Sequence, residues 1–164
     1  MTDSILLVID VQRGFVNGGT GDIVDKVTAL QDRFDRVIAS RFVNPEGSMH
    51  RRLLHWPRFA PGEAETELAF TPRADARILD KSTYTCLGPD LRAELTRDGI
   101  DEVHLCGIAT DNCVLKTAVD LFEARIRPVV HADACASHGG AECHTAGLML
   151  LKRFVGAEQV LGEG

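Results

Sequence analysis

The sequence has no long apolar run and no excess of positive charge. No run approaches the roughly 20 apolar residues of a membrane span, and residues 4–11 are too few for the apolar core of a secretory signal. Lys and Arg together number 18 against 24 Asp and Glu, and the cationic residues are scattered along the chain. Nucleic-acid binding depends on clustered cations. We therefore expect a cytoplasmic protein that binds neither nucleic acid nor a membrane.

The chain also lacks a cysteine pattern typical of disulfide-bonded proteins. An odd number of cysteines without a secretory signal disfavours a disulfide framework. Cys106 lies inside an apolar run and is interpreted as a small core residue. Cys113 instead lies where a strand-like run gives way to a helix-like one. A helix N-terminus favours the thiolate, so we expect Cys113 to face solvent and to be nucleophilic near neutral pH.

Strand-like and helix-like patterns alternate along the 164 residues, with no internal repeat or linker. We expect one domain over 1–164, with an α/β fold of three α/β/α layers around a doubly wound, six-stranded, mainly parallel sheet. Asp22 is the expected N-cap of the first helix. The predicted strands are 5–9, 37–43, 76–79, 102–106, 127–131 and 159–161, and the predicted helices are 23–34, 89–95, 114–124 and 141–154.

The least regular part of the chain is residues 44–72. It holds four of the six prolines and the only tryptophan, Trp56. Two interpretations stay open: a cover over the substrate, or a long surface loop with one short helix around residues 49–54.

Polar residues directly after strands are the first candidates for a site, because ligands of an open parallel sheet bind at the carboxyl ends of its strands. Asp10 follows the first strand, Lys81 the third and Cys113 the fourth. Asp10 could serve as the base and Lys81 could stabilise the thiolate, while backbone N–H groups could hold an oxyanion. Together these groups predict acyl transfer through a thioester, although each residue alone also suits a structural role.

Aromatic residues are few, namely seven Phe, one Tyr and one Trp. Phe15 follows Asp10 and Tyr84 follows Lys81, so we expect both, together with Trp56, to line a partly apolar pocket for a planar or small aliphatic substrate. Core packing is an alternative for Phe15 and Trp56. Asn44 and Thr110 are further candidates for substrate contact, and Thr110 also suits a helix N-terminus.

Three motifs resemble those of the isochorismatase-like cysteine hydrolases, which include nicotinamidases and N-carbamoylsarcosine amidohydrolases. The motifs are ILLVIDVQRGF at 5–15, KSTY at 81–84 and GIATDNCV at 107–114. The resemblance implies that Asp10, Lys81 and Cys113 form a catalytic triad. It also implies a cis peptide between Ile108 and Ala109, which would turn the Ala109 N–H, beside that of Cys113, toward the oxyanion. Members of the family commonly self-associate, so we expect a homodimer or larger homo-oligomer.

The sequence departs from the nicotinamidases at their metal site. Those enzymes carry an Asp-x-His motif after the second strand, whereas this chain has RFVNPEGS at 41–48. His50 and His55, with Glu46 nearby, leave a non-standard metal site open, but we interpret both histidines as solvated. We interpret Cys135 to His144 as structural. Residues 18–21 lack the lysine of a phosphate loop, which disfavours nucleotide binding. We therefore predict no metal and no other cofactor.

We expect a hydrolase that cleaves a C–N bond of a small amide or carbamoyl compound through a thioester, without a metal. One alternative is vinyl-ether hydrolysis of an isochorismate-like dianion, which the arginines at 41, 51, 52 and 58 could bind. A second alternative is a catalytically silent binding protein of the same fold.

Overall fold

The computed structural model describes residues 3–162, which form one six-stranded sheet with every strand pair parallel. The strand order is β3-β2-β1-β4-β5-β6. The chain begins in the middle of the sheet and reverses its direction of winding after β3, which confirms the predicted doubly wound α/β fold. The strands are β1 (Ile5–Ile9), β2 (Arg36–Phe42), β3 (Arg77–Lys81), β4 (Glu102–Ile108), β5 (Arg127–Ala136) and β6 (Val160–Leu161).

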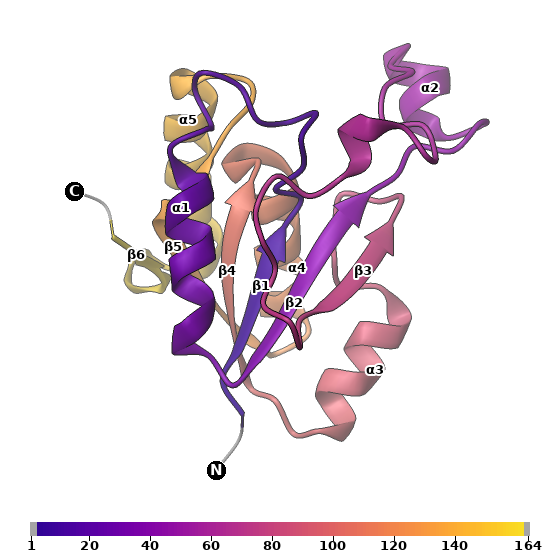
Figure 1. The fold of residues 1–164 in the computed structure, drawn as a ribbon. Helices are drawn as coiled ribbons and strands as arrows, with labels where there is room; N and C mark the ends of the chain where they lie inside the picture. The colour runs from indigo at the N-terminus through magenta and orange to yellow at the C-terminus, as the bar shows by residue number, and fades with distance from the viewer. Residues whose placement is uncertain (1–2, 163–164) are drawn as a thin grey trace.

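Helices cover both faces of the sheet, with α1 in front and α4 behind in Figure 1. The α-helices are α1 (Ile23–Leu30), α2 (Met49–Leu54), α3 (Pro89–Arg97), α4 (Leu115–Glu123) and α5 (Ala141–Val155). Short 3-10 turns lie at Gln31–Arg33, Ala64–Thr66 and Ala157–Gln159, and a wide π-type turn lies at Thr110–Val114.

The alternation of side chains along β1 explains why this strand is apolar throughout. Ile5, Leu7 and Ile9 pack in the core that contains residues of α3, α4 and α5. Leu6 and Val8 point to the opposite face and pack with residues of α1. A central strand of a parallel sheet has no solvent-facing side, so every position must be apolar. Its first polar position, Asp10, therefore lies where the strand ends.

Two local predictions are wrong. Asp22 does not cap α1, because its backbone is already helical and its side chain makes no capping bond. The fifth strand does not end at residue 131, because β5 continues to Ala136 with a register shift against β4. The polar residue Asp133 is compatible with the longer strand, because it takes the one exposed position on this part of it.

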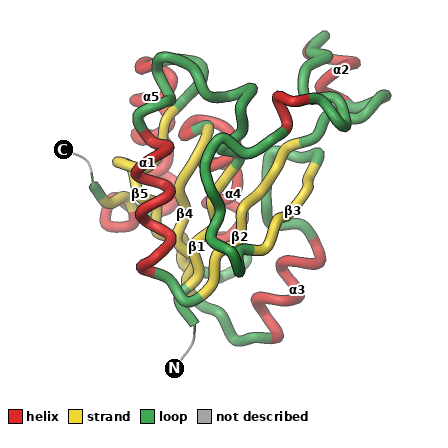
Figure 2. Tube along the Cα trace, viewed as in Figure 1, coloured by secondary structure: helices red, strands yellow, loops and turns green. Residues whose placement is uncertain are grey.

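The segment between β2 and β3 is mostly irregular backbone, shown in green in Figure 2, and includes the predicted short helix α2. Part of this segment belongs to the core, since Phe59 is fully buried and packs with the residues around α1. The buried side chain of Gln12 joins the segment to the sheet. Its amide nitrogen donates to the carbonyl oxygens of Phe42 and Thr66, both at 2.9 Å, and its oxygen accepts the Phe42 N–H at 2.8 Å.

No helix within residues 3–162 is long and apolar enough to cross a membrane. All five cysteines are free thiols, and Cys106 is fully buried. Along α5, Leu151 is fully buried, whereas Met149 is 63% exposed. Self-association stays a prediction.

Candidate active site

The sheet brings Asp10, Lys81 and Cys113 together although they are far apart in the sequence. Asp10 follows β1, and Cys113 lies in the turn after the neighbouring strand β4. Lys81 ends β3, which is separated from β1 by β2, so only a long side chain can span the distance. The Lys81 Nζ atom is 2.8 Å from Asp10 Oδ2 and 3.8 Å from Cys113 Sγ.

The ammonium of Lys81 is held on several sides. It donates to the carbonyl oxygens of Thr83 at 2.7 Å and Tyr84 at 3.2 Å, as well as to Asp10. Burial is the largest single influence and disfavours its charge, but Asp10, Cys86 and Cys113 together outweigh burial and raise the pKa of Lys81 above its usual value. Lys81 is therefore a fixed cation rather than a proton donor.

Cys113 is buried, with 8% of its surface exposed, so the predicted solvent-facing thiol is wrong. Burial, followed by the charge of Asp10, raises the pKa of the Cys113 thiol well above its usual value, and Lys81 only partly opposes this. The resting group is therefore a neutral thiol. The favourable helix terminus expected from the sequence is outweighed by desolvation.

Asp10 is anchored by a residue that sequence reasoning missed. The Ser40 hydroxyl donates to Asp10 Oδ1 at 2.7 Å, and both residues are fully buried. Ser40 lies in the apolar strand β2, where a small polar residue gave no separate signal. Only the pairing of β2 with β1 brings it to Asp10.

The backbone before Cys113 has an unusual path. Gly107 has φ 122°, and a Cβ there would lie 2.1 Å from the carbonyl oxygen of Ile9, so only glycine fits. The peptide bond between Ile108 and Ala109 is cis. The Ala109 carbonyl then accepts the N–H groups of Asn112 at 3.0 Å and Val114 at 3.1 Å, which closes the wide turn that carries Cys113.

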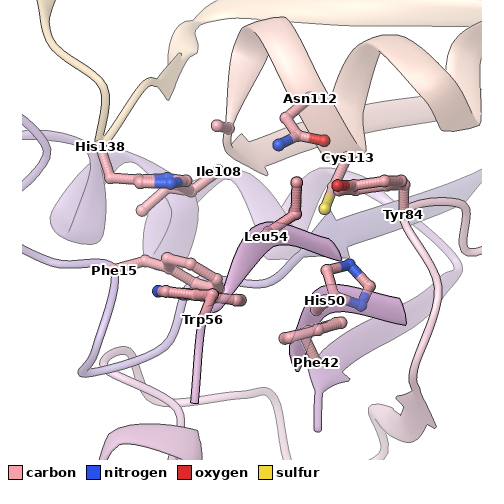
Figure 3. A pocket seen from close by; sticks show the side chains of 11 residues that line it. Phe15, Phe42, His50, Leu54, Trp56, Tyr84, Ile108, Asn112, Cys113 and His138 are labelled. Carbon is pink, nitrogen blue, oxygen red and sulfur yellow. The ribbon is translucent and has the colours of Figure 1, made fainter. Parts of the chain in front are cut away.

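A cavity of about 300 Å³ opens beside the sulfur of Cys113. Figure 3 shows Cys113 and Tyr84 on one side of it and Phe15 and His138 on the other. None of the residues that line it is an acid, a lysine or an arginine: they are Phe15, Phe42, His50, Leu54, Trp56, Tyr84, Ile108, Ala109, Asn112, Cys113 and His138.

Ring contacts organise the cavity walls. The Phe15 ring stacks on Phe59, with centroids 4.1 Å apart, and meets His138 at 4.7 Å. His50 packs edge-on against Phe42 at 4.9 Å and Tyr84 at 5.0 Å. The His50 ring is therefore part of the cavity wall, which corrects the expectation that it is simply solvated.

Both histidines are uncharged at neutral pH. Burial, followed by the charge of Lys81, lowers the pKa of His50. Burial also lowers the pKa of His138, where the opposing influence of Asp111 is smaller. The cavity therefore offers polar but neutral groups around an apolar centre.

The structure brings Phe15, Tyr84 and Trp56 to the cavity but not Asn44 or Thr110. Asn44 is fully buried and its amide donates to the carbonyl oxygens of Trp56 at 2.8 Å and Arg58 at 2.9 Å. The Thr110 hydroxyl bonds to His144 Nδ1 at 2.7 Å. The polar groups of both side chains already have protein partners. Both residues therefore support the structure around the cavity and do not line it.

Phe42, His50, Leu54 and His138 line the cavity without having been predicted to do so. They come from β2, the segment around α2 and the turn after β5, which only the tertiary fold brings together. Asn112, next to Cys113 in the sequence, also lines the cavity.

The side chains near the site do not form a metal-binding set. Among residues 3–162, no group of three or more His, Cys, Asp or Glu side chains is arranged to hold an ion. After β2, where nicotinamidases have their metal motif, the buried amide of Asn44 donates to carbonyl oxygens. His55 ends α2 on the surface. No step of the chemistry is therefore assigned to a metal.

Comparison with known proteins agrees with this fold. The isochorismatase domain model matches residues 4–160. An uncharacterised isochorismatase family protein of Bacillus subtilis is 40% identical over 81 residues, which are 49% of this chain and 44% of that protein. The match thus spans less than half the length of that relative.

Two solved structures cover nearly the whole chain. A nicotinamidase from Bacillus subtilis has 26% identity and a TM-score of 0.82, covering 99% of this chain and 100% of that one. A pyrazinamidase of Pyrococcus horikoshii in complex with zinc has 27% identity and a TM-score of 0.80, covering 93% and 96%. On the combined strength of the domain match and the fold, this chain belongs to the isochorismatase family of hydrolases.

Proposed function

We propose that the protein hydrolyses the C–N bond of a small, uncharged amide through a thioester on Cys113. The observation that carries this proposal is the contact of Lys81 Nζ with both Asp10 Oδ2 and Cys113 Sγ, at 2.8 and 3.8 Å, beside a cavity of amide-sized volume. A base, a fixed cation and a nucleophile are the three groups that this chemistry needs.

Asp10 moves the protons. It accepts the thiol proton of Cys113 as the sulfur attacks the amide carbonyl, and the carbonyl oxygen becomes an oxyanion. Backbone N–H groups of Ala109 and Cys113 hold this oxyanion. Asp10 then gives the proton to the nitrogen, the C–N bond breaks and the amine leaves. Water attacks the thioester, Asp10 takes a water proton and returns it to the departing sulfur, and the acid is released.

The neutral state of the resting thiol fits this sequence of steps. A resting ion pair between Lys81 and the Cys113 thiolate would require the thiolate to be stabilised, whereas burial favours the neutral thiol. The proton therefore leaves Cys113 together with nucleophilic attack. Lys81 stays charged throughout and offsets the negative charge that passes between Asp10 and the sulfur.

The cavity lining favours flat, uncharged substrates. Aromatic rings supply apolar surface, and neutral His50 and His138 supply hydrogen-bonding groups without charge. Nicotinamide and pyrazinamide, the amides after which the structural relatives are named, have this chemistry and are the first substrates to test.

A dianionic isochorismate-like substrate fits less well. Arg41 pairs with Asp80, Arg51 donates to the Asn44 carbonyl and Arg58 pairs with Glu65. None of the four arginines named from the sequence lines the cavity. The amide is therefore the preferred substrate class over the vinyl ether.

The test measures ammonia release from nicotinamide, pyrazinamide and benzamide by the wild type and by Cys113→Ala. We expect at least a thousandfold lower kcat for the variant, because the covalent route is lost. Cys143→Ala is the control, since Cys143 is a partly exposed thiol outside the cavity, and should keep wild-type rates. Undiminished hydrolysis by Cys113→Ala, or no hydrolysis of any uncharged amide by the wild type, contradicts the proposal.

Metal independence has its own measurement. Exhaustive chelation followed by assay in metal-free buffer should change kcat/KM less than twofold, because the residues near Cys113 include no metal-binding set within the described chain. A large loss that added zinc restores would overturn this part of the proposal.

A further inference from the structure

Ser40 takes no direct part in the proposed reaction, yet its hydroxyl fixes both ends of Asp10. The hydroxyl donates to Asp10 Oδ1 at 2.7 Å. The same Oγ accepts the backbone N–H of Asp10 at 3.2 Å. Both residues are fully buried, so no solvent competes for these bonds.

The backbone explains why Asp10 needs a side-chain partner. β1 ends at Ile9, and Asp10 has φ 47°, a left-handed conformation that takes it out of the strand. Its N–H then goes to Ser40 Oγ. Ser40 is within reach because β2 runs parallel to β1, with Ala39 beside Val8.

The carboxylate of Asp10 is held from two directions. Ser40 binds Oδ1 and Lys81 binds Oδ2 at 2.8 Å. A carboxylate has about four lone-pair sites, so two fixed donors set the direction of the others. Lys81 Nζ also lies 3.8 Å from the sulfur of Cys113, so the carboxylate and the thiol share this cation. Without Ser40, one oxygen would lose its anchor and the group could rotate about Lys81.

We propose that Ser40 is a positioning residue, whose hydroxyl orients the Asp10 carboxylate toward the Cys113 thiol and stabilises its charged form. This inference rests on the proposed function, because it assigns Ser40 a role through Asp10 as the base. A hydrogen bond to a buried charged group has a large effect compared with a neutral one.

The primary experiment is the pH profile of kcat/KM for Ser40→Ala. We expect the plateau to fall about 10- to 100-fold, the range for loss of one charge-assisted hydrogen bond. The acid limb should move to higher pH, because the carboxylate loses a donor that favours its charged form. A lower plateau with an unmoved acid limb means a structural role only and overturns the proposal.

Two further variants separate positioning from packing. Ser40→Thr keeps the hydroxyl and should restore the wild-type acid limb. Thr117→Val removes another fully buried hydroxyl, one that accepts the Cys86 N–H at 3.0 Å, and should leave the limb unchanged. A shift as large in Thr117→Val as in Ser40→Ala contradicts a specific role for Ser40.

A measurement without substrate keeps this inference separate from the proposed function. The rate of iodoacetamide labelling at Cys113, followed by peptide mass spectrometry from pH 5 to 9, reports proton transfer to Asp10. We expect the Ser40→Ala profile to be displaced toward higher pH relative to that of the wild type. Superimposed profiles overturn the Ser40 inference. If the wild type hydrolyses no amide, the proposed function fails, but the labelling profiles still decide the role of Ser40.

Discussion

The cavity has two walls that are built in different ways. One wall comes from the sheet, where Asp10 and Cys113 follow adjacent buried strands and hydrogen bonds fix each reactive group. The other wall comes from residues 43–76, where α2 contributes His50 and Leu54 although none of its residues is buried. The sheet wall owes its position to the core, whereas on the other wall Phe59 is buried in the core but α2 has no buried residue.

Because of this difference, we expect the sheet wall to carry the reactive groups and the other wall to select the substrate. The sheet cannot shift without disturbing the core, so it suits groups whose spacing sets the reaction rate. The segment around α2 can change sequence or position at lower cost, so it suits groups that select the substrate. Changes on the sheet wall should therefore affect kcat and stability, and changes on the other wall should affect mainly KM.

The largest expected effect is at Lys81. Lys81→Met leaves the buried carboxylate of Asp10 without its counter-charge, which should lower the free energy of unfolding by about 3–5 kcal/mol and abolish turnover. The double variant with Asp10→Asn removes both charges and should recover most of the stability but none of the activity. Denaturant unfolding and amide assays measure the two effects. Equal instability of both variants would assign the loss to packing rather than charge.

The next largest effect is expected at Asn44, which holds part of the second wall in place. Asn44→Ala removes the amide that donates to the Trp56 and Arg58 carbonyls, and should cost about 2–3 kcal/mol of stability. We expect KM to rise about tenfold with kcat within threefold, because the segment is displaced while the triad is intact. Steady-state kinetics at saturating substrate provide the measurement. A kcat loss larger than the KM change would break the proposed division between the walls.

Acid should destabilise the sheet through His131, which is 6% exposed on β5. Burial, with the nearby charges of His104 and Arg33, lowers its pKa from 6.5 to about 4. The unfolded chain therefore binds the proton first. His131 therefore contributes at most about 3 kcal/mol to the free energy of unfolding. This contribution is complete above pH 6.5 and is lost as pH falls through 4.

Unfolding at a series of pH values tests this contribution. His131→Gln should flatten the slope of unfolding free energy against pH between 4 and 6.5, because Gln does not titrate. His55→Gln, at an exposed position after α2, is the control and should retain the wild-type slope. An unchanged slope in His131→Gln would show that His131 is not the source of this pH dependence.

The smallest effect compares two adjacent exposed leucines on α2. Leu53 is 65% exposed and Leu54 is 59% exposed, but only Leu54 lines the cavity. Leu54→Ala should raise KM about threefold, from lost apolar contact, and Leu53→Ala should leave KM unchanged. Both variants should unfold within about 0.5 kcal/mol of the wild type. Equal KM values in the two variants would exclude Leu54 from substrate contact.

The sequence predicted the elements of the sheet and the three residues at its strand ends because both depend on local pattern and strand order. An apolar run such as Ile5–Ile9 specifies a buried strand, and a polar residue directly after it marks the ligand-binding edge. The family resemblance pointed to the same three residues. These features need no knowledge of how distant segments pack.

The environment of those residues was not predictable in the same way. The burial that keeps Cys113 protonated depends on packing from several elements, and a helix-terminus argument considers only one. Ser40 and His138 join the site only through strand pairing and chain folding. Asn44 was predicted to contact the substrate, but its position in the sequence does not distinguish such contact from support of a loop.

The site depends on Gly107 because this residue has no side chain. Because a single added carbon would collide with the backbone of Ile9, the chain segments that precede the base and the nucleophile meet at this glycine. Any replacement would push these two segments apart and lengthen the path of the proton from sulfur to carboxylate. In a mutational scan, position 107 should therefore tolerate no other amino acid, even though glycine itself contributes no reactive group.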